Sequence, residues 1–198
     1  MEKPAETQFP IQDLIARRWS PRAFQPKALS REQVGALLEA VRWAPSSFNE
    51  QPWRMMVAER GDAAAFEAML GCLLPGNQTW AQHAGLLMVS LAQTRFKRND
   101  RVNRHAFHDV GLAMGQLGIQ ATALGLSLHQ MAGIDVDRIR QTYALQEGCE
   151  PVAGVAVGYA AEPESLPENL AERERAPRQR MALKDLVFTG TFGHPWLG

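Results

Sequence analysis

The spacing of apolar residues along the chain predicts where helices begin and end. Ser30 and Gln33 have the arrangement of a capping box, with Ser30 as N-cap and Gln33 three residues later. The segment that follows repeats apolar residues at helical spacing as far as Val41. This helix should end near Ala44, because a residue that precedes proline is disfavoured in helical geometry.

Other segments have helical or strand patterns. Helices are expected over residues 9–18, 61–74, 106–126 and 135–143. Strands are expected over residues 53–58, 86–91 and 152–159, the last being an apolar, β-branched run typical of a central strand. Strands interleaved with helices indicate an α/β or α+β layered architecture. The length of 198 residues suits a single domain.

The C-terminal segment, residues 161–198, departs from this pattern. It is polar and rich in Pro, Glu and Arg, and it ends in the apolar piece FTGTFGHPWL. A structureless stretch of this length is uncommon inside a compact domain, so the segment is either disordered or packs along another surface. Phe188, Phe192 and Trp196 favour packing, and a second subunit is the natural surface.

Composition narrows the class of protein. Lys and Arg total 21, as do Asp and Glu, so no overall field attracts nucleic acid or a membrane. We find neither a secretory signal nor an apolar run long enough to span a bilayer, and we expect a cytoplasmic protein. Cys72 and Cys149 should be reduced thiols. His105 and His108 lack a third ligand cluster nearby, so no metal site is expected.

Two short motifs carry candidate chemistry. Residues 17–24 (RRWSPRAF) bring three guanidinium groups and a hydroxyl into six residues, a set that can bind a phosphate dianion. A solvated basic face at a helix end would look the same, and taken alone it is the better reading. Residues 45–53 (PSSFNEQPW) can present hydroxyls and carboxamides to a planar heterocycle, or can form an ordinary turn.

Together, the order and spacing of these motifs resemble the nitroreductase family. A basic element soon after the first helix precedes a proline-bracketed loop before the first strand. The likeness extends over roughly residues 9–196. Further matching positions are the late helix and glycine turn, the last strand and a C-terminal basic pair, found here as residues 123–126, 131–133 and 152–159 with Arg178 and Arg180.

The resemblance implies an α+β, three-layer fold in one domain, residues 1–198. A central mixed, mostly antiparallel sheet would be flanked by helices. It also implies a homodimer with FMN at the interface, in which residues 161–198 form a domain-swapped C-terminal extension that packs on the partner subunit. A small-molecule electron acceptor would be the other partner, with no nucleic acid or membrane involved.

The resemblance also implies the site residues. One subunit would bind the flavin phosphate and pyrimidine edge through Arg18, Trp19, Ser20 and Arg22. The other would place Pro45, Ser46, Ser47 and Asn49 against the ring. Further cofactor-binding positions are Asn77 at the pyrimidine edge, Met131, Ala132 and Gly133 near the reactive nitrogen, and Arg178 and Arg180 at the phosphate. Arg22 and Asn77 are the candidate catalytic groups, because a cation near the pyrimidine edge stabilises reduced flavin.

Three positions depart from the family pattern. Trp80 stands where many members carry a second basic residue, Ala132 where a glutamate is frequent, and Asp109 where some relatives have glutamine. These differences leave the physiological substrate and the effect on the flavin potential open.

The implied function is an FMN-dependent oxidoreductase. It would take hydride from NAD(P)H and pass it to nitroaromatic, quinone or similar electron-poor acceptors. Because no GxGxxG fingerprint is present, NAD(P)H should bind transiently, which predicts ping-pong kinetics. There are two alternatives. One is a flavoprotein of the same fold with another redox reaction, such as dehydrogenation or dehalogenation, and the other is a non-catalytic flavin-binding module. The basic segment 92–105 suggests an anionic donor such as NADPH, or is a solvated loop.

Overall fold

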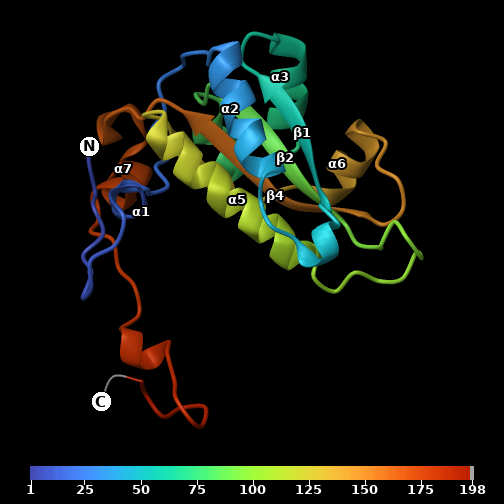
Figure 1. Cartoon of the computed structure of the whole chain (residues 1–198). Coiled ribbons are helices and arrows are strands. Elements are labelled where there is room, and N and C mark those ends of the chain that lie inside the picture. Colours follow the sequence, from blue (N-terminus) through green and yellow to red (C-terminus); the bar gives the residue numbers. More distant parts are fainter. Residues whose placement is uncertain (197–198) are drawn as a thin grey trace.

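The computed structural model describes residues 1–196, and a four-stranded sheet forms its centre (Figure 1). The strand order is β1-β2-β4-β3, and every pairing among the described strands is antiparallel. The expected mixed sheet therefore has no parallel component within this part of the chain. The strands are β1 (Trp53–Glu59), β2 (Leu86–Gln93), β3 (Ser127–Met131) and β4 (Cys149–Gly158).

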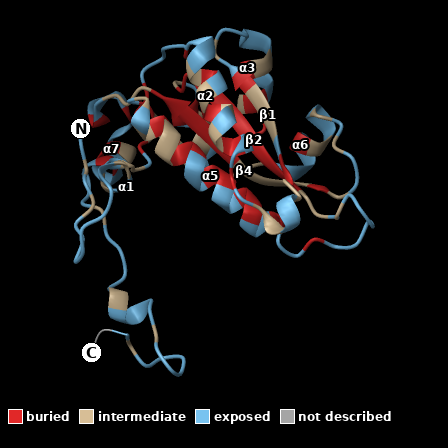
Figure 2. Cartoon of the chain, viewed as in Figure 1, coloured by how far each residue is buried: buried red, intermediate tan, exposed pale blue. Residues whose placement is uncertain are grey.

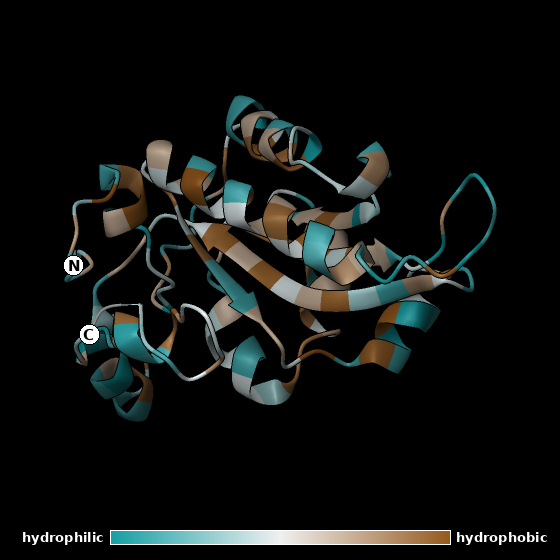
Figure 3. Ribbon diagram, turned by 60° about the horizontal axis from the view of Figure 1, so that its bottom comes forward, coloured by the Kyte–Doolittle hydropathy of each residue, from teal (hydrophilic) through white to brown (hydrophobic). Residues whose placement is uncertain are grey.

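Helices cover both faces of the sheet, which confirms the α+β, three-layer fold. Alternate residues of β2 point to opposite faces, as the two-residue period of a strand requires. Leu86 and Met88 belong to a hydrophobic cluster with α2 (Arg31–Arg42) and α5 (Ala106–Ala123). Leu87 and Val89 belong to a second cluster, with α3 (Ala63–Leu70), α4 (Pro75–Ala81) and α6 (Val136–Thr142). In Figure 3 the central strands carry much of the hydrophobic colour, whereas the outer loops are mainly hydrophilic.

Local signals explain where several helices begin. The predicted capping box is present, because Ser30 Oγ accepts from the Gln33 amide at 3.2 Å and Gln33 Oε1 accepts from the Ser30 amide at 3.0 Å. The Asp135 side chain caps α6 through the Arg138 amide at 2.9 Å. Pro75 stands at the start of α4, where its missing N–H costs nothing.

Three expectations need correction. The helix predicted over residues 9–18 forms only α1 (Asp13–Arg17), which has no buried residue to stabilise a longer helix. The helix predicted over 61–74 ends at Leu70, and α4 follows as a separate helix. The longest helix ends at Ala123 rather than 126, and β3 follows it where no strand was expected.

The C-terminal segment is partly ordered on the domain and partly extended away from it. It begins with η2 (Pro163–Ser165) and α7 (Glu168–Arg175), and η3 (Leu183–Asp185) lies further along. Residues 181–196 leave the body of the domain and are mostly exposed (Figures 1 and 2). Phe192 is 94% exposed. Leu197 and Gly198, the last residues of the predicted extension, lie outside the described residues.

Within residues 1–196, no helix combines the length and the apolar character that crossing a membrane would require.

Candidate functional site

A cavity of about 240 Å³ lies between the RRWSPRAF segment and the residues that follow α7. It brings together residues that are far apart in the sequence, and six of the predicted cofactor-binding residues are on its wall. Its lining contains six cations and one carboxylate: Lys3, Arg18, Arg22, Arg173, Arg178 and Arg180, with Glu174. The neutral predicted residues Trp19 and Ser20 also line it.

The carboxylate of Glu174 does not neutralise these cations. Its side chain is buried, with 2% of the residue exposed, and Oε1 accepts from the backbone amides of Arg22 at 2.8 Å and Ala23 at 3.0 Å. In the described residues no ion pair joins it to a guanidinium. Glu174 therefore fixes the backbone of the RRWSPRAF segment, and the cavity keeps a large positive excess.

The cations of the cavity destabilise one another. Burial lowers the pKa of Arg18, and the charges of Arg178 and Arg180 lower it further. Burial and the charge of Arg180 likewise lower the pKa of Arg178. Arg18 also donates to Ser20 Oγ at 3.4 Å. Like charges at close range favour an anion with several oxygen acceptors, and a phosphate meets this requirement.

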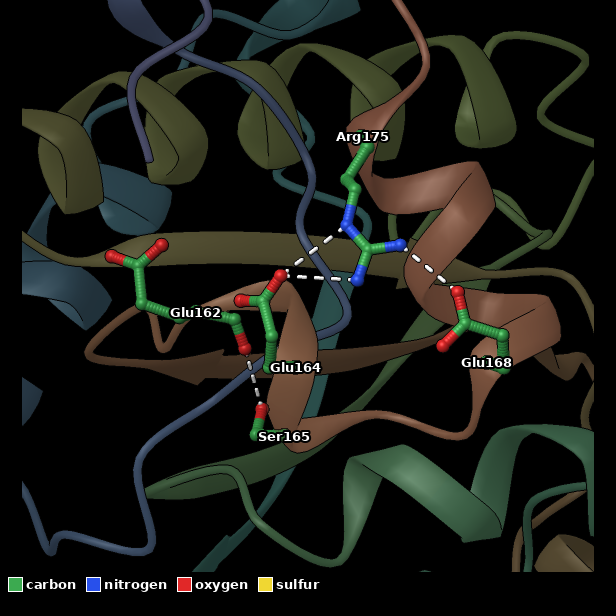
Figure 4. Close-up of polar contacts among 5 residues, drawn as sticks. All are labelled: Glu162, Glu164, Ser165, Glu168 and Arg175. Atoms are coloured by element: carbon green, nitrogen blue, oxygen red, sulfur yellow. Dashed lines mark hydrogen bonds and ion pairs between the residues drawn. The ribbon is translucent and has the colours of Figure 1, made fainter.

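Helix α7 and two backbone contacts position Arg178 at the cavity. In α7, Arg175 bridges Glu164 and Glu168, with nitrogen–oxygen distances of 3.0 Å to each (Figure 4). These exposed pairs each contribute little, but they tie the helix to the segment before it. The chain then turns back, and Arg178 Nη1 donates to the carbonyls of Lys3 at 2.6 Å and Ala16 at 2.9 Å.

The second predicted element, the loop 45–52, adopts a strained conformation. Phe48, Asn49 and Gln51 have φ angles of 55°, 52° and 51°, a region that non-glycine residues rarely occupy. Side chains of the loop hold it: Ser46 Oγ accepts from the Gln51 amide at 3.0 Å, and Gln51 Nε2 donates to Asn49 Oδ1 at 3.1 Å. Two predicted flavin ligands therefore also shape their own loop.

Asp109 anchors this loop to α5. Its carboxylate is buried, with 2% of the residue exposed, and Oδ2 accepts from the Ser47 amide at 3.1 Å. The other oxygen, Oδ1, lies 3.1 Å from His108 Nδ1. The sequence showed Asp109 only as a departure from the family pattern, and its anchoring role was missed. A carboxylate at a buried position of the first helical turn was the available signal.

Within one chain, the two motifs do not form one site. None of Pro45, Ser46, Ser47 or Asn49 is among the residues that line the cavity.

Asn77 and Gly133 lie together, and neither is among the residues that line the cavity. Asn77 Nδ2 donates to the Gly133 carbonyl at 3.0 Å. A Cβ added to Gly133 would lie only 2.6 Å from Asn77 Nδ2, so a larger residue here would displace the Asn77 amide. Of their neighbours, Ala132 is exposed, whereas the Met131 side chain is buried in the core. Met131 can therefore offer a ligand only its backbone.

Trp80 does not occupy a ligand-facing position. It is 1% exposed and belongs to the core, with ring centroids 6.2 Å from Phe24 and 4.7 Å from His129. The departure from the family cation at this position is a packing feature. Trp80 supports the end of the RRWSPRAF segment through Phe24.

His129 supports the same segment from β3. Its Nδ1 lies 2.9 Å from the Pro21 carbonyl, which can only accept, so Nδ1 carries the proton. Burial lowers the pKa of His129 to about 4, and the nearby charge of Arg22 adds to the effect. The imidazole is therefore neutral near pH 7 and holds the backbone next to Arg22.

The basic segment 94–105 folds back on itself and docks on the loop 45–52. Its two arms are joined by the Asn103 amide donating to Thr94 at 2.7 Å, and the Lys97 amide donates to Glu50 Oε1 at 2.7 Å. The guanidinium carbon of Arg98 lies 4.8 Å from the centroid of the Phe48 ring. The positive charges of this segment thus lie beside the strained loop.

The two cysteines form no disulfide in the described part of the chain. Cys72 and Cys149 are free and buried, and burial raises the pKa of the Cys149 thiol. In the same part of the chain, no group of three or more His, Cys, Asp or Glu side chains could hold a metal ion.

Comparison with known proteins identifies the family of the chain. The profile of the nitroreductase family matches residues 15–159, and the chain belongs to that family. As a member, it is an oxidoreductase. A solved structure described as an oxidoreductase containing FMN is 34% identical, with a TM-score of 0.90 and coverage of 96% of each chain.

Two curated relatives are similar to this chain over most of their length. An uncharacterised 15.4 kDa protein in the ask 5′ region of Mycolicibacterium smegmatis is 37% identical over 149 residues, which are 72% of this chain and 99% of the relative. A Bacillus subtilis (strain 168) protein provisionally named an NAD(P)H nitroreductase is 27% identical over 187 residues, with 76% of this chain and 88% of the relative covered.

Replacing Asp109 tests its role as the anchor of the loop. Asp109→Ala leaves the Ser47 amide without its acceptor and should reduce the free energy of unfolding by about 1–3 kcal/mol. Asp109→Asn keeps an acceptor oxygen and should cost less. Chemical denaturation gives the energies, and hydrogen exchange at residues 47–51 should accelerate more in the Ala variant. Equal exchange in wild type and Asp109→Ala would show that another contact holds the loop.

The lowered pKa of His129 predicts a pH dependence of stability. Between about pH 6.5 and 4 the unfolded chain protonates His129 while the folded chain does not, so the free energy of unfolding should fall as the pH falls through this window. The full difference is on the order of 3 kcal/mol. His129→Gln should lose this slope in urea denaturation, whereas the exposed His194→Gln should keep it. A wild-type slope in His129→Gln would contradict the assignment.

Proposed function

We propose that the chain is an FMN-dependent oxidoreductase that takes hydride from NAD(P)H and passes it to an electron-poor small molecule, such as a nitroaromatic compound or a quinone. Family membership and the likeness to an FMN-containing oxidoreductase support the cofactor. The name of the Bacillus subtilis relative supports the donor. The observation that carries the proposal is the cationic cavity, which has the donors and the excess charge that a flavin phosphate requires.

The residues present fit FMN. Arg18, Ser20, Arg178 and Arg180 would hold the phosphate, because their nitrogen and hydroxyl donors share one cavity. Arg22 and Asn77 would face the pyrimidine edge, and the backbone around Gly133 would lie near the reactive nitrogen. When bound, the flavin supplies the hydride-transfer chemistry, and the protein supplies position and charge.

Arg22 is the residue best prepared to stabilise charge at the pyrimidine edge. Its amide is fixed by Glu174, and the carbonyl of the preceding residue, Pro21, is fixed by His129. Because the backbone is already held at two points, only the side chain remains to be ordered when a ligand binds. We infer that Arg22 stabilises the negative charge that reduction places on the flavin, and that Asn77 orients the same edge.

The enzyme would work as a homodimer that completes the site. The strained loop 45–52 does not reach the cavity of its own chain, so the loop of a second copy would cover the flavin ring. The exposed face of α5 suits this contact: Phe107 and Leu112 are exposed there, and a Cβ added to Gly111 or Gly115 would meet nothing within 4 Å. The exposed aromatic residues of the C-terminal extension would pack on the partner subunit.

NAD(P)H and the acceptor would use this site in turn. The sequence offers no separate dinucleotide-binding fingerprint, so the donor would bind over the flavin and leave before the acceptor enters. Ping-pong kinetics would follow.

Cofactor binding tests the proposal directly. The purified protein should be yellow, hold one FMN per subunit and bleach anaerobically with NADH or NADPH. Arg18→Ala should raise the Kd for FMN about 10- to 100-fold, because it removes charge-assisted hydrogen bonds to phosphate. Arg31→Ala removes an exposed arginine outside the cavity and should change nothing. A colourless protein that binds no added FMN would refute the proposal.

The segment 94–105 predicts a preference for the phosphorylated donor. It carries five cations against Asp100 and lies beside the loop that would cover the flavin. Arg98→Glu with Arg101→Glu should raise the KM for NADPH much more than the KM for NADH. Arg31→Glu is the control for overall charge. Equal effects on the two donors would assign the segment to a solvated surface.

A further inference from the structure

The N-terminal segment, residues 1–5, contributes one side chain to the wall of the cationic cavity. Lys3 lines the cavity beside Arg18 and Arg178. The amide of Ala5 donates to the Ala16 carbonyl at 2.8 Å, which holds the segment alongside α1. The family match begins only at residue 15, so these residues lie outside the part of the chain that the family defines.

The Lys3 ammonium is bound to the backbone at the end of α7. It donates to the carbonyl of Glu174 and to the carbonyl of Ala176, the latter at 2.5 Å, and it lies 5.0 Å from the centroid of the Trp19 ring. An ammonium group has three donors. Two are used by the backbone, and the third remains on a side chain that forms part of the cavity wall.

Arg178 makes the reciprocal contact. Its Nη1 donates to the carbonyl of Lys3 and to that of Ala16, at 2.6 and 2.9 Å. A guanidinium has five N–H donors, so three remain for a ligand after these two. Each of the two residues therefore binds the backbone of the other's segment and keeps donors for an anion in the cavity.

The reciprocal contacts of Lys3 and Arg178 oppose the electrostatic repulsion among the cations of the cavity. Arg178 and Arg180 face Arg18 across the cavity closely enough to lower its pKa. In the absence of an anion, repulsion favours withdrawal of residues 176–180. The contacts of Lys3 and Arg178 oppose that withdrawal, and a bound phosphate would remove its cause.

We propose that residues 1–5 are a clasp that completes the phosphate site, with Lys3 both a phosphate-binding residue and the residue that positions 176–180. The inference rests on the proposed function, in which the cavity takes the phosphate of FMN. Clasp closure and anion binding then stabilise each other, because coupling between two binding events is reciprocal. The N-terminal segment is thus part of the cofactor site although it lies outside the family match.

Anion titrations of the apoprotein test the clasp. FMN and, separately, inorganic phosphate are titrated into wild type, Lys3→Met, Lys3→Arg and Lys27→Met. Lys3→Met should raise both dissociation constants about tenfold, the value of one charge-assisted hydrogen bond. Lys3→Arg keeps a cationic donor and should recover most of the affinity. Lys27→Met removes a lysine outside the cavity and should match wild type.

Hydrogen exchange provides a readout that does not depend on activity. In wild type, inorganic phosphate should slow exchange in residues 3–6 and 176–182 together. In Lys3→Met, residues 176–182 should exchange faster before any anion is added. Unchanged affinity in Lys3→Met, or weakened affinity with unchanged exchange, would overturn the clasp.

The two proposals fail in distinguishable ways. Wild type that binds phosphate but not FMN would refute the flavin assignment, while the phosphate arm would still decide on the clasp. If wild type and Lys3→Met bind FMN equally tightly, the clasp is refuted and the flavin assignment stands.

Discussion

The central physical constraint on the site is that the fold holds mutually repelling cations together in one small cavity. Lys3, Arg18, Arg178 and Arg180 come from three separate stretches of the chain, and the carboxylate beside them is occupied by backbone amides. Their mutual repulsion and the solvation of each charge would favour their separation. Backbone contacts hold them together, so the cavity is prepared for an anion before one arrives. In the proposed site, the stability of the RRWSPRAF segment, of α7 and of the N-terminal residues would therefore be linked to a single ligand.

The other half of the proposed site is held by a different form of strain. Three non-glycine residues of the loop 45–52 have positive φ angles, and Asp109 reaches from the first turn of α5 to fix the Ser47 amide. This loop is held by side-chain hydrogen bonds and does not line the cavity of its own chain. In the proposed dimer, the cavity of one copy would bind the phosphate and the loop 45–52 of the other would cover the ring. Neither copy alone would have a complete site.

Local features were predictable from the sequence, and contacts over long distances along the chain were not. The capping box at Ser30 and the buried strands β2 and β4 follow from nearest-neighbour chemistry, and the structure contains them. Strand β3 was missed because SLHQM has a weak pattern of its own and becomes a strand by pairing with β4. The basic motif identified Arg18 and Arg22. Glu174 and Lys3 lacked any local signal, since their contacts span more than 150 residues.

Mixed dimers test the central claim, that each flavin site takes its phosphate residues from one subunit and its loop from the other. An Arg18→Ala subunit and a Ser47→Trp subunit, whose indole would fill the space of the ring, are each expected to give homodimers that do not retain FMN. We expect the purified heterodimer to hold one tightly bound FMN, because one of its two sites combines an intact cavity with an intact loop. A heterodimer without tightly bound FMN would show that the cavity and the loop of one site do not come from different subunits.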